Sequence, residues 1–264
     1  WRTEGVEKFS GALGGLGLTP KSKLGILCLN QMENLIAIFG TLLKGIPFVP
    51  LNPFLTPKDL VYIVQNAQID ILLVDGVFVK QEMEPFFKLF KNKILAGSCE
   101  EPGFLGDGVK GFEEFVDNGN RQEGLRPHVR SQGIPDVILY TSGTTTKPKG
   151  VMLDEMQFYQ NSEAFLAHLM LTEDERCIVA LPLFHSFGNI MALTLIRIGG
   201  SLILLRHFAP KSILENIVKH QATLLPLVPT IYAFLIELYG RGGYDVSSLR
   251  LCISGGASLP QILP

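Results

Sequence analysis

Short apolar runs alternate with longer segments of helical character along almost the whole chain, and this alternation limits the folds that it can adopt. Runs such as 24–29, 71–74 and 177–181 are rich in branched aliphatic residues, as buried strands are. The segments between them, such as 32–43 and 211–220, are expected to be helical. Repeated strand–helix–strand units predict an α/β fold with parallel sheets covered by helices.

The composition narrows the class of protein. With 264 residues and 47% hydrophobic residues, the chain can bury one large core or two modest ones. A formal net charge of −2 gives no basic field for binding nucleic acid. The cysteines lie far apart without metal-ligand spacing, which predicts reduced thiols and a cytosolic location; they are Cys28, Cys99, Cys177 and Cys252.

Residues 140–150 form a hydroxyl-rich loop, Tyr-Thr-Ser-Gly-Thr-Thr-Thr-Lys-Pro-Lys-Gly, after the strand expected at 136–139. Glycine lets backbone N–H groups converge on an anion, the hydroxyls donate further hydrogen bonds, and Lys149 adds positive charge. The order differs from a Walker loop, in which Gly-Lys-Ser/Thr opens a helix. A polar surface hairpin has a similar composition, but we favour the interpretation as a phosphate-binding loop.

The same residues resemble the phosphate loop of the adenylate-forming superfamily, which includes acyl- and aryl-CoA synthetases, luciferases and the adenylation domains of peptide synthetases. The family loop usually runs Tyr/Phe-Thr-Ser-Gly-Thr-Thr-Gly-x-Pro-Lys-Gly-Val, and this chain departs from it at Thr146. A β-branched residue is poorly suited to positive φ. If the family glycine has positive φ, this loop must bend differently or bind ATP more weakly.

Three further segments resemble family motifs and occur in the family's order. They are residues 181–188 (Leu-Pro-Leu-Phe-His-Ser-Phe-Gly), which in the family border the acyl pocket, residues 227–232 (Leu-Val-Pro-Thr-Ile-Tyr), which start a helix, and residues 249–260, whose Ser-Gly-Gly-Ala turn meets the adenine. Residues 30–53 resemble the family's first helix and following strand. The resemblance is closest to the N-terminal domain of an AMP-forming fatty acyl-CoA synthetase.

The resemblance also implies the site residues. The expected ATP-binding residues are Thr141, Ser142, Gly143, Thr144, Thr145, Thr146, Lys149, Gly255, Gly256 and Ala257, with Thr144 also helping to hold Mg²⁺. His185 is the expected catalytic residue, as a gate near the carboxylate and thiol path. From the residues alone, a structural histidine is an equal alternative for His185. The hydroxyls could equally cap turns, and Gly255–Gly256 could form only a tight turn.

The family organisation predicts two subdomains, each with a helix-flanked, mostly parallel sheet. Residues 22–170 would form the first and carry the phosphate loop, while residues 1–21 and 172–264 would form the second. The ATP site is expected between the two. The chain ends at Pro264, before the family's Tyr-Gly-x-Thr-Glu motif and C-terminal domain. We therefore expect a truncated chain that is inactive alone.

The implied enzyme is an AMP-forming acid–thiol ligase that uses ATP, Mg²⁺ and, as co-substrate, CoA. In the family's amino-acid-activating domains, an Asp near this segment binds the amino group. Residues 184–188 contain no acid, so the resemblance favours a fatty or aryl acid over an amino acid. An acyl-carrier-protein ligase is one alternative. A catalytically inactive nucleotide-binding or regulatory protein of the same fold, or an unrelated α/β nucleotide-binding module, is another. The expected location is cytoplasmic, with peripheral membrane contact left open.

Overall fold

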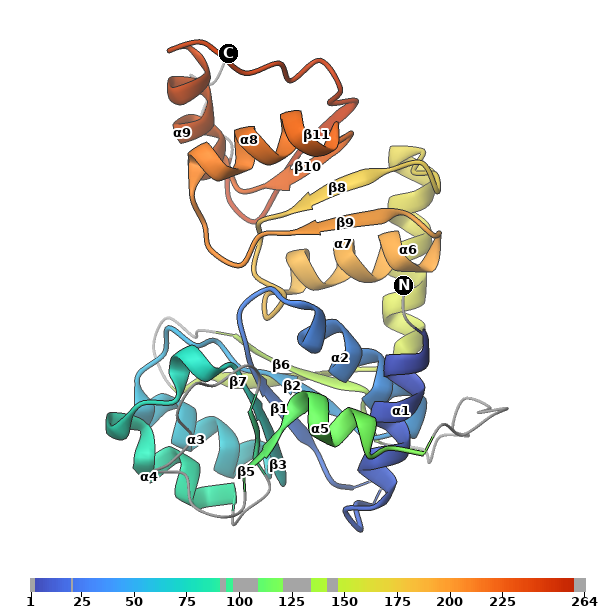
Figure 1. The fold of residues 1–264 in the computed structure, drawn as a ribbon, viewed down its shortest axis with the longest axis vertical. Coiled ribbons are helices and arrows are strands. Elements are labelled where there is room, and N and C mark those ends of the chain that lie inside the picture. Colours follow the sequence, from blue (N-terminus) through green and yellow to red (C-terminus); the bar gives the residue numbers. More distant parts are fainter. Residues whose placement is uncertain are drawn as a thin grey trace. The chain divides into compact units, whose positions relative to one another are not determined.

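The chain forms two compact units, each built around one β-sheet (Figure 1). The computed structural model describes residues 3–19, 21–90, 94–96, 109–120, 134–141 and 147–258. Unit 1 comprises residues 1–155 and unit 2 comprises residues 156–264. The predicted α/β class with two helix-flanked sheets is confirmed.

Unit 1 contains a seven-stranded sheet with the order β5-β4-β3-β1-β2-β6-β7. All neighbouring strands are parallel except β6 and β7, which form an antiparallel hairpin. The strands are β1 (Leu24–Leu27), β2 (Phe48–Pro50), β3 (Ile71–Val74), β4 (Ile94–Ala96), β5 (Val109–Gly111), β6 (Val137–Thr141) and β7 (Lys149–Leu153). Every residue of β1 and β3 is buried, as expected of strands covered on both faces.

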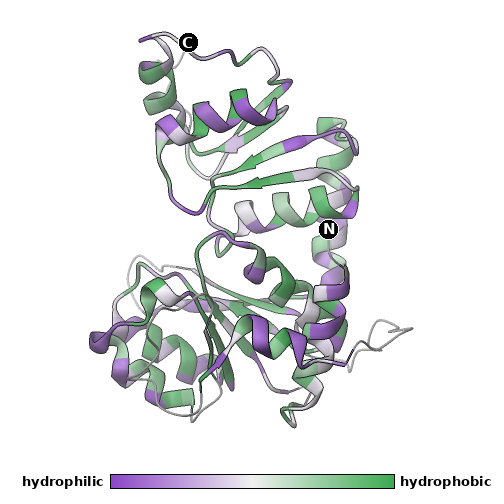
Figure 2. Cartoon of the chain, viewed as in Figure 1, coloured by the Kyte–Doolittle hydropathy of each residue, from purple (hydrophilic) through white to green (hydrophobic). Residues whose placement is uncertain are grey.

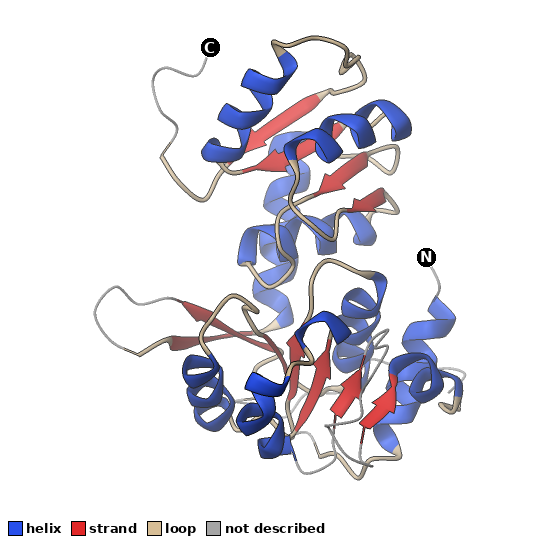
Figure 3. Cartoon of the chain, turned by 60° about the vertical axis from the view of Figure 1, so that its left-hand side comes forward, coloured by secondary structure: helices blue, strands red, loops and turns tan. Residues whose placement is uncertain are grey.

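Helices cover both faces of this sheet (Figure 3). They are α1 (Thr3–Gly14), α2 (Met32–Lys44), α3 (Pro57–Ala67), α4 (Glu84–Phe87) and α5 (Phe112–Asp117), with short 3-10 turns at 76–78, 81–83 and 88–90. A side-chain cap marks the start of α3: the Thr56 side chain accepts a hydrogen bond from the Asp59 N–H, and Pro57 occupies the first turn. The strands are mostly apolar, and the helices carry polar outer residues (Figure 2).

Helix α1 packs within unit 1. Its Phe9 is fully buried and contacts two rings of α5. The centroid of the Phe9 ring lies 5.5 Å from that of Phe112 and 5.6 Å from that of Phe115. Gly40 of α2 makes room for this ring, because a Cβ there would lie 2.5 Å from the Phe9 Cδ1. Burial of Phe9 therefore places α1 with unit 1, which differs from the grouping of residues 1–21 with the second subdomain expected from the family.

Unit 2 contains a four-stranded, all-parallel sheet with the order β11-β10-β8-β9. The boundary between the units falls after Glu155, whereas the family organisation predicted it near residue 170. The elements are α6 (Glu155–Leu169), β8 (Arg176–Val179), α7 (Ser186–Arg197), β9 (Ser201–Leu204), α8 (Pro210–His220), β10 (Leu224–Leu227), α9 (Pro229–Tyr239) and β11 (Leu251–Ser254).

The strand order of unit 2 reverses between β8 and β10. The chain runs from β8 through α7 to β9 on one side, and then through α8 to β10 on the other side of β8. In open α/β sheets, ligands bind outside the carboxyl ends of the strands at such a reversal. Within the described residues, no helix has both the length and the apolar character needed to cross a bilayer.

Candidate nucleotide-binding site

The first candidate segment lies in unit 1, at the end of the β6–β7 hairpin. The ladder pairs Tyr140 with Gly150 and Thr141 with Lys149, the last pair before the turn. Side chains alternate between the two faces of a strand, so Thr141 and Lys149 share one face and are exposed. The expected residues Ser142, Gly143, Thr144, Thr145 and Thr146 lie outside the described residues.

The ring of Tyr140 occupies the space that a side chain at position 150 would need, which explains the glycine there. A Cβ at Gly150 would lie 2.9 Å from the Ile138 Cγ2 and 3.0 Å from the Tyr140 Cζ, so the ring lies against the bare backbone of β7. The Tyr140 hydroxyl donates a hydrogen bond to the Asn66 Oδ1 on α3, at 2.6 Å. This face of the hairpin is therefore turned toward α3, and Thr141 and Lys149 point the opposite way.

The two lysines of the loop have different surroundings. The Lys147 Nζ lies 4.9 Å from the centroid of the Tyr62 ring on α3, a cation–π contact. Lys149 lies on the opposite face of the hairpin, beside Thr141. Lys149 thus shares its face with Thr141, whose hydroxyl donates to the Lys149 carbonyl oxygen at 3.5 Å. A lysine beside a hydroxyl is a donor set suited to a phosphate group.

The other candidate segments meet in unit 2. His185 precedes α7 and follows β8, Val228 is the N-cap of α9 after β10, and residues 255–257 follow β11. Because these strands are parallel, all three segments lie at one edge of the sheet, next to the strand-order reversal. The Gly255 N–H donates to the Leu227 carbonyl oxygen at 3.1 Å, which joins the ends of β11 and β10.

The glycine turn after β11 packs against the starts of both helices. A Cβ at Gly255 would lie 3.0 Å from the Phe187 Cε1 of α7. Gly256 has φ +78°, a conformation that favours glycine, and a Cβ there would lie 3.4 Å from the Val228 Cγ1. Gly256 and Ala257 are exposed. The structure therefore brings Gly255, Gly256 and Phe187 together.

His185 lies at the surface of unit 2. Its backbone is fixed, because its N–H donates to the Pro182 carbonyl and its own carbonyl accepts from Asn189. Its side chain makes no capping bond to α7, and its ring lies 4.7 Å from that of Phe184. Partial burial lowers the pKa of His185, which favours the neutral imidazole at pH 7.

Tyr232 links α9 to two strands, a role that the sequence motif did not reveal. Its hydroxyl contacts the carbonyl oxygens of Leu225 in β10 and Ile253 in β11, the latter at 3.3 Å. Burial raises the pKa of Tyr232, so the hydroxyl stays protonated and donates. Tyr232 therefore ties α9 to the end of β11, the strand that leads into the turn at Gly255.

A buried acid holds the opposite ends of the same strands. The Glu175 Oε2 accepts a hydrogen bond from Thr223 at 2.5 Å, and its Oε1 accepts one from the Arg250 Nε at 2.9 Å. The Glu175 side chain is only 4% exposed. These residues precede β8, β10 and β11, so the cluster fixes the amino ends of three strands whose carboxyl ends carry the candidate motifs.

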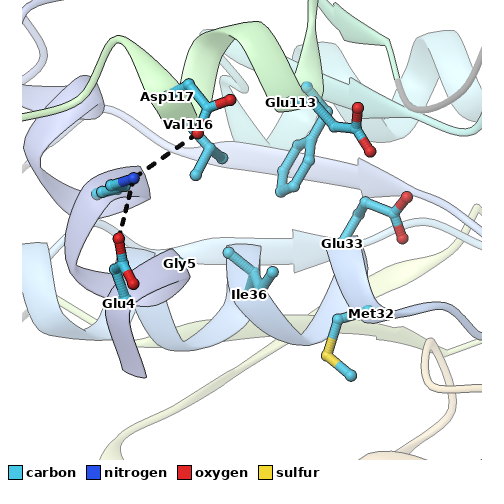
Figure 4. A pocket seen from close by; sticks show the side chains of 10 residues that line it. Glu4, Gly5, Met32, Glu33, Ile36, Glu113, Val116 and Asp117 are labelled. Atoms are coloured by element: carbon cyan, nitrogen blue, oxygen red, sulfur yellow. Dashed lines mark ion pairs between the residues drawn. The ribbon is translucent and has the colours of Figure 1, made fainter. Parts of the chain in front are cut away.

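A pocket of about 360 Å³ in unit 1 lies between α1, α2 and α5, and none of the expected ATP-binding residues lines it (Figure 4). Four carboxylates surround it, and its single cation, Lys8, already pairs with Glu4 at 3.1 Å and Asp117 at 3.7 Å. This charge would repel a triphosphate. The remaining lining residues are Gly5, Met32, Glu33, Ile36, Phe112, Glu113 and Val116.

A metal centre built only from protein side chains is not seen in the described ranges. They contain no group of three or more His, Cys, Asp or Glu residues placed to hold a metal ion. Thr144, the expected Mg²⁺ contact, is outside these ranges. A magnesium ion that arrives with a nucleotide needs few protein ligands, because phosphate oxygens and water supply the rest.

Relatives of known activity share both sequence and fold with this chain. The AMP-binding enzyme family model matches residues 3–264. The chain is 30% identical over 257 residues to a (7a-methyl-1,5-dioxo-octahydro-1H-inden-4-yl)propanoyl:CoA ligase of Mycobacterium tuberculosis, covering 96% of this chain and 50% of that protein. It is 28% identical to a long-chain-fatty-acid–CoA ligase of Bacillus subtilis, covering 92% and 48%. The chain spans about half the length of the curated relatives it matches.

Solved structures share the fold of this chain. A long-chain-fatty-acid-CoA ligase from Archaeoglobus fulgidus superposes with a TM-score of 0.86 at 20% identity, covering 98% of this chain and 50% of that one. ATP-bound MatB from Rhodopseudomonas palustris superposes with a TM-score of 0.78 at 25% identity, covering 96% and 48%. With the family model matched over residues 3–264, the chain belongs to the AMP-binding enzyme family.

Proposed function

We propose that the full-length protein activates a carboxylic acid with ATP and transfers the acyl group to CoA. The observation that carries this proposal is the contact between Gly255 and Phe187. This contact links two segments that we expect at the site. The glycine turn at 255–257 is expected to meet adenine, and residues 181–188 are expected to border the acyl pocket. The two lie at the strand-order reversal of unit 2, where α/β sheets bind ligands.

The chemistry consists of two displacements. In the first, a carboxylate oxygen attacks the α-phosphorus of ATP, and the bond from this phosphorus to the pyrophosphate oxygen breaks. In the second, the CoA sulfur, after loss of its proton, attacks the acyl carbon, and the bond to the AMP oxygen breaks. Both steps need alignment and charge neutralisation rather than a protein nucleophile. Mg²⁺ bound with ATP supplies part of the positive charge.

The described residues fit the first displacement. The exposed Thr141 hydroxyl and Lys149 ammonium share one face of the hairpin, where they would donate to phosphate oxygens. The bare backbone at Gly255 and Gly256 would let the flat face of adenine approach closely. We assign the other phosphate contacts to residues 142–146, in line with the family motif.

His185 fits a role beside the acyl group. Its exposed ring stands at the start of α7, two residues before Phe187, and the lowered pKa keeps it neutral. A neutral imidazole can accept the thiol proton or a hydrogen bond as the thiol approaches. This assignment makes His185 more important in the second displacement than in the first.

The acid is proposed to be hydrophobic. Residues 184–188 contain no acid, so they offer no partner for the amino group of an amino acid. The names of the ligases from M. tuberculosis and B. subtilis, and of a 4-coumarate:CoA ligase of Petunia hybrida that is 29% identical, specify ring-bearing, fatty and aromatic acids. All three names specify CoA, which favours CoA over a carrier protein as acceptor.

ATP–pyrophosphate exchange by the full-length protein tests the first step, using fatty acids of graded chain length and aryl acids. We expect exchange with at least one acid and thioester formation when CoA is added. The Lys149→Ala variant should exchange at least tenfold more slowly than the wild type. Lys88→Ala, which removes an exposed lysine of unit 1, should leave the exchange rate unchanged. ATP binding without exchange for any acid would favour the alternative of an inactive nucleotide-binding protein.

A further inference from the structure

Helix α3 contacts the β6–β7 hairpin on both sides of residues 142–146. Tyr62 and Asn66 are four residues apart, so their side chains lie on the same face of α3. Asn66 accepts the hydrogen bond from the Tyr140 hydroxyl at 2.6 Å, just before this segment. Lys147 directly follows this segment, and its Nζ lies 4.9 Å from the centroid of the Tyr62 ring. One helix therefore contacts a residue before this segment and a residue after it.

The holding surface is part of the core of unit 1. Leu60, Ile63 and Val64 of α3 are buried in its main hydrophobic cluster, and the rings of Tyr62 and Tyr140 pack against the same cluster. Burial raises the pKa of Tyr140, so its hydroxyl remains a donor. The two contacts are therefore made from a helix that cannot shift without disturbing the core.

The geometry has a consequence for ligand binding. A pair of donor groups that is held in one orientation before a ligand arrives loses less conformational entropy on binding. The same contacts turn Tyr140 toward α3 and so leave Thr141 and Lys149 on the opposite face. Loss of either contact would widen the range of positions open to the hairpin end, without removing any group that touches phosphate.

We propose that Tyr62 and Asn66 are positioning residues for ATP, acting through Lys147 and Tyr140 on the end of the β6–β7 hairpin that carries Thr141 and Lys149. The proposal rests on the ATP-dependent function proposed above. It identifies two residues on α3, outside every motif in the sequence that suggested nucleotide binding. It also gives Lys147 a role distinct from that of Lys149.

Steady-state kinetics of the full-length protein test the proposal. Tyr62→Leu and Asn66→Ala should each raise the KM for ATP about two- to fivefold, the range expected from losing one exposed contact of this kind. The kcat and the KM for CoA should stay unchanged. Tyr62→Phe keeps the aromatic face and should retain the wild-type KM. Gln65→Ala, an exposed change on the same helix, is the matched control.

Double-variant cycles identify the partners. Adding Lys147→Ala to Tyr62→Leu should raise the KM for ATP no further, and adding Tyr140→Phe to Asn66→Ala should behave in the same way. Fully additive effects would overturn the proposal, because the residues would then act independently. Equal melting temperatures for Tyr62→Leu, Tyr62→Phe and wild type would exclude loss of folding as the cause of a raised KM.

Hydrogen exchange separates this proposal from the proposed function. Without ligand, the amides of Thr141 and Lys149 should exchange faster in Tyr62→Leu and Asn66→Ala than in the wild type or Gln65→Ala. Unchanged exchange together with an unchanged KM for ATP would overturn the positioning role. If the wild type binds no ATP, the proposed function fails and the positioning of ATP fails with it. Faster exchange in that case would support only a structural link between α3 and the hairpin.

Discussion

The Pro182 carbonyl oxygen lies where a side chain on Gly188 would begin: a Cβ at Gly188 would be 2.4 Å from it and 2.9 Å from the Leu181 carbonyl oxygen. Gly188 is the third residue of α7, and the segment between β8 and α7 folds back directly over it. Only a residue without a side chain permits this approach. The position of His185 depends on it, because His185 lies in that segment.

Gly188→Ala should therefore destabilise the protein by about 2–3 kcal/mol, since backbone must move to admit the methyl group. A matched control is Gly5→Ala in α1, where a Cβ would lie 3.4 Å from the Ile36 Cδ1, an ordinary contact. That change should stabilise by about 0.5–1 kcal/mol through helix propensity. Urea unfolding measures both, and equal stability of Gly188→Ala and wild type would contradict the close approach.

Arg250→Ala should destabilise the protein by about 2 kcal/mol, because it leaves the buried Glu175 carboxylate without its cation. The loss stays below that of a fully buried pair, since the Arg250 side chain is 43% exposed and water replaces part of the interaction. Arg241→Ala breaks an exposed pair with Glu237 and should change stability by no more than about 0.5 kcal/mol. Similar thermal unfolding of the two variants would argue against a special role for Glu175.

Gly255→Ala should weaken ATP binding more than it lowers stability. The added Cβ would lie 3.0 Å from the Phe187 Cε1, which a small rotation of the ring can relieve, but it would also cover the backbone expected to face adenine. Phe187→Leu combined with Gly255→Ala should restore stability without restoring ATP affinity. Calorimetric titration with ATP, together with melting temperatures, distinguishes the two effects. Recovery of full affinity in the double variant would show that only packing was disturbed.

The pKa of His185 in the folded protein should be lower than in the unfolded chain, because partial burial disfavours the charged ring. Its contribution to stability is then complete above the unfolded pKa and is lost as the pH falls toward the folded value. NMR titration of the His185 ring, with and without denaturant and assigned through His185→Gln, measures both values. A higher pKa in the folded protein would contradict this prediction, because the His185 contribution to stability would then be lost as the pH rises.

Patterns within single elements predicted most of the fold. Strand β3 has the predicted bounds, and helices α2 and α8 differ by one residue at one end from the predicted 32–43 and 211–220. In the region between residues 97 and 134, the sequence pattern indicated neither a helix nor a strand. Strand β5 and helix α5, at 109–117, were missed because their three to six residues are too few to establish a period.

Long-range packing accounts for the other differences. The Phe9 contact that draws α1 into unit 1 joins residues about a hundred positions apart, and no local pattern encodes it. The motifs identified Lys149, His185 and Gly255 in the sequence, but they did not predict that Phe187 would contact Gly255. Tyr62 and Asn66 carried no signal, because their role arises only when α3 packs beside the hairpin.

The buried Glu175 cluster has a practical consequence for protein engineering. It ties β8, β10 and β11 at the edge of the sheet opposite to residues 184–187 and 255–257. Libraries that randomise those loops should therefore yield a high fraction of folded clones, since the strands stay in register from their other ends. The acid preference proposed above could then be altered by selection on these loops alone, with Gly188 and Glu175 unchanged.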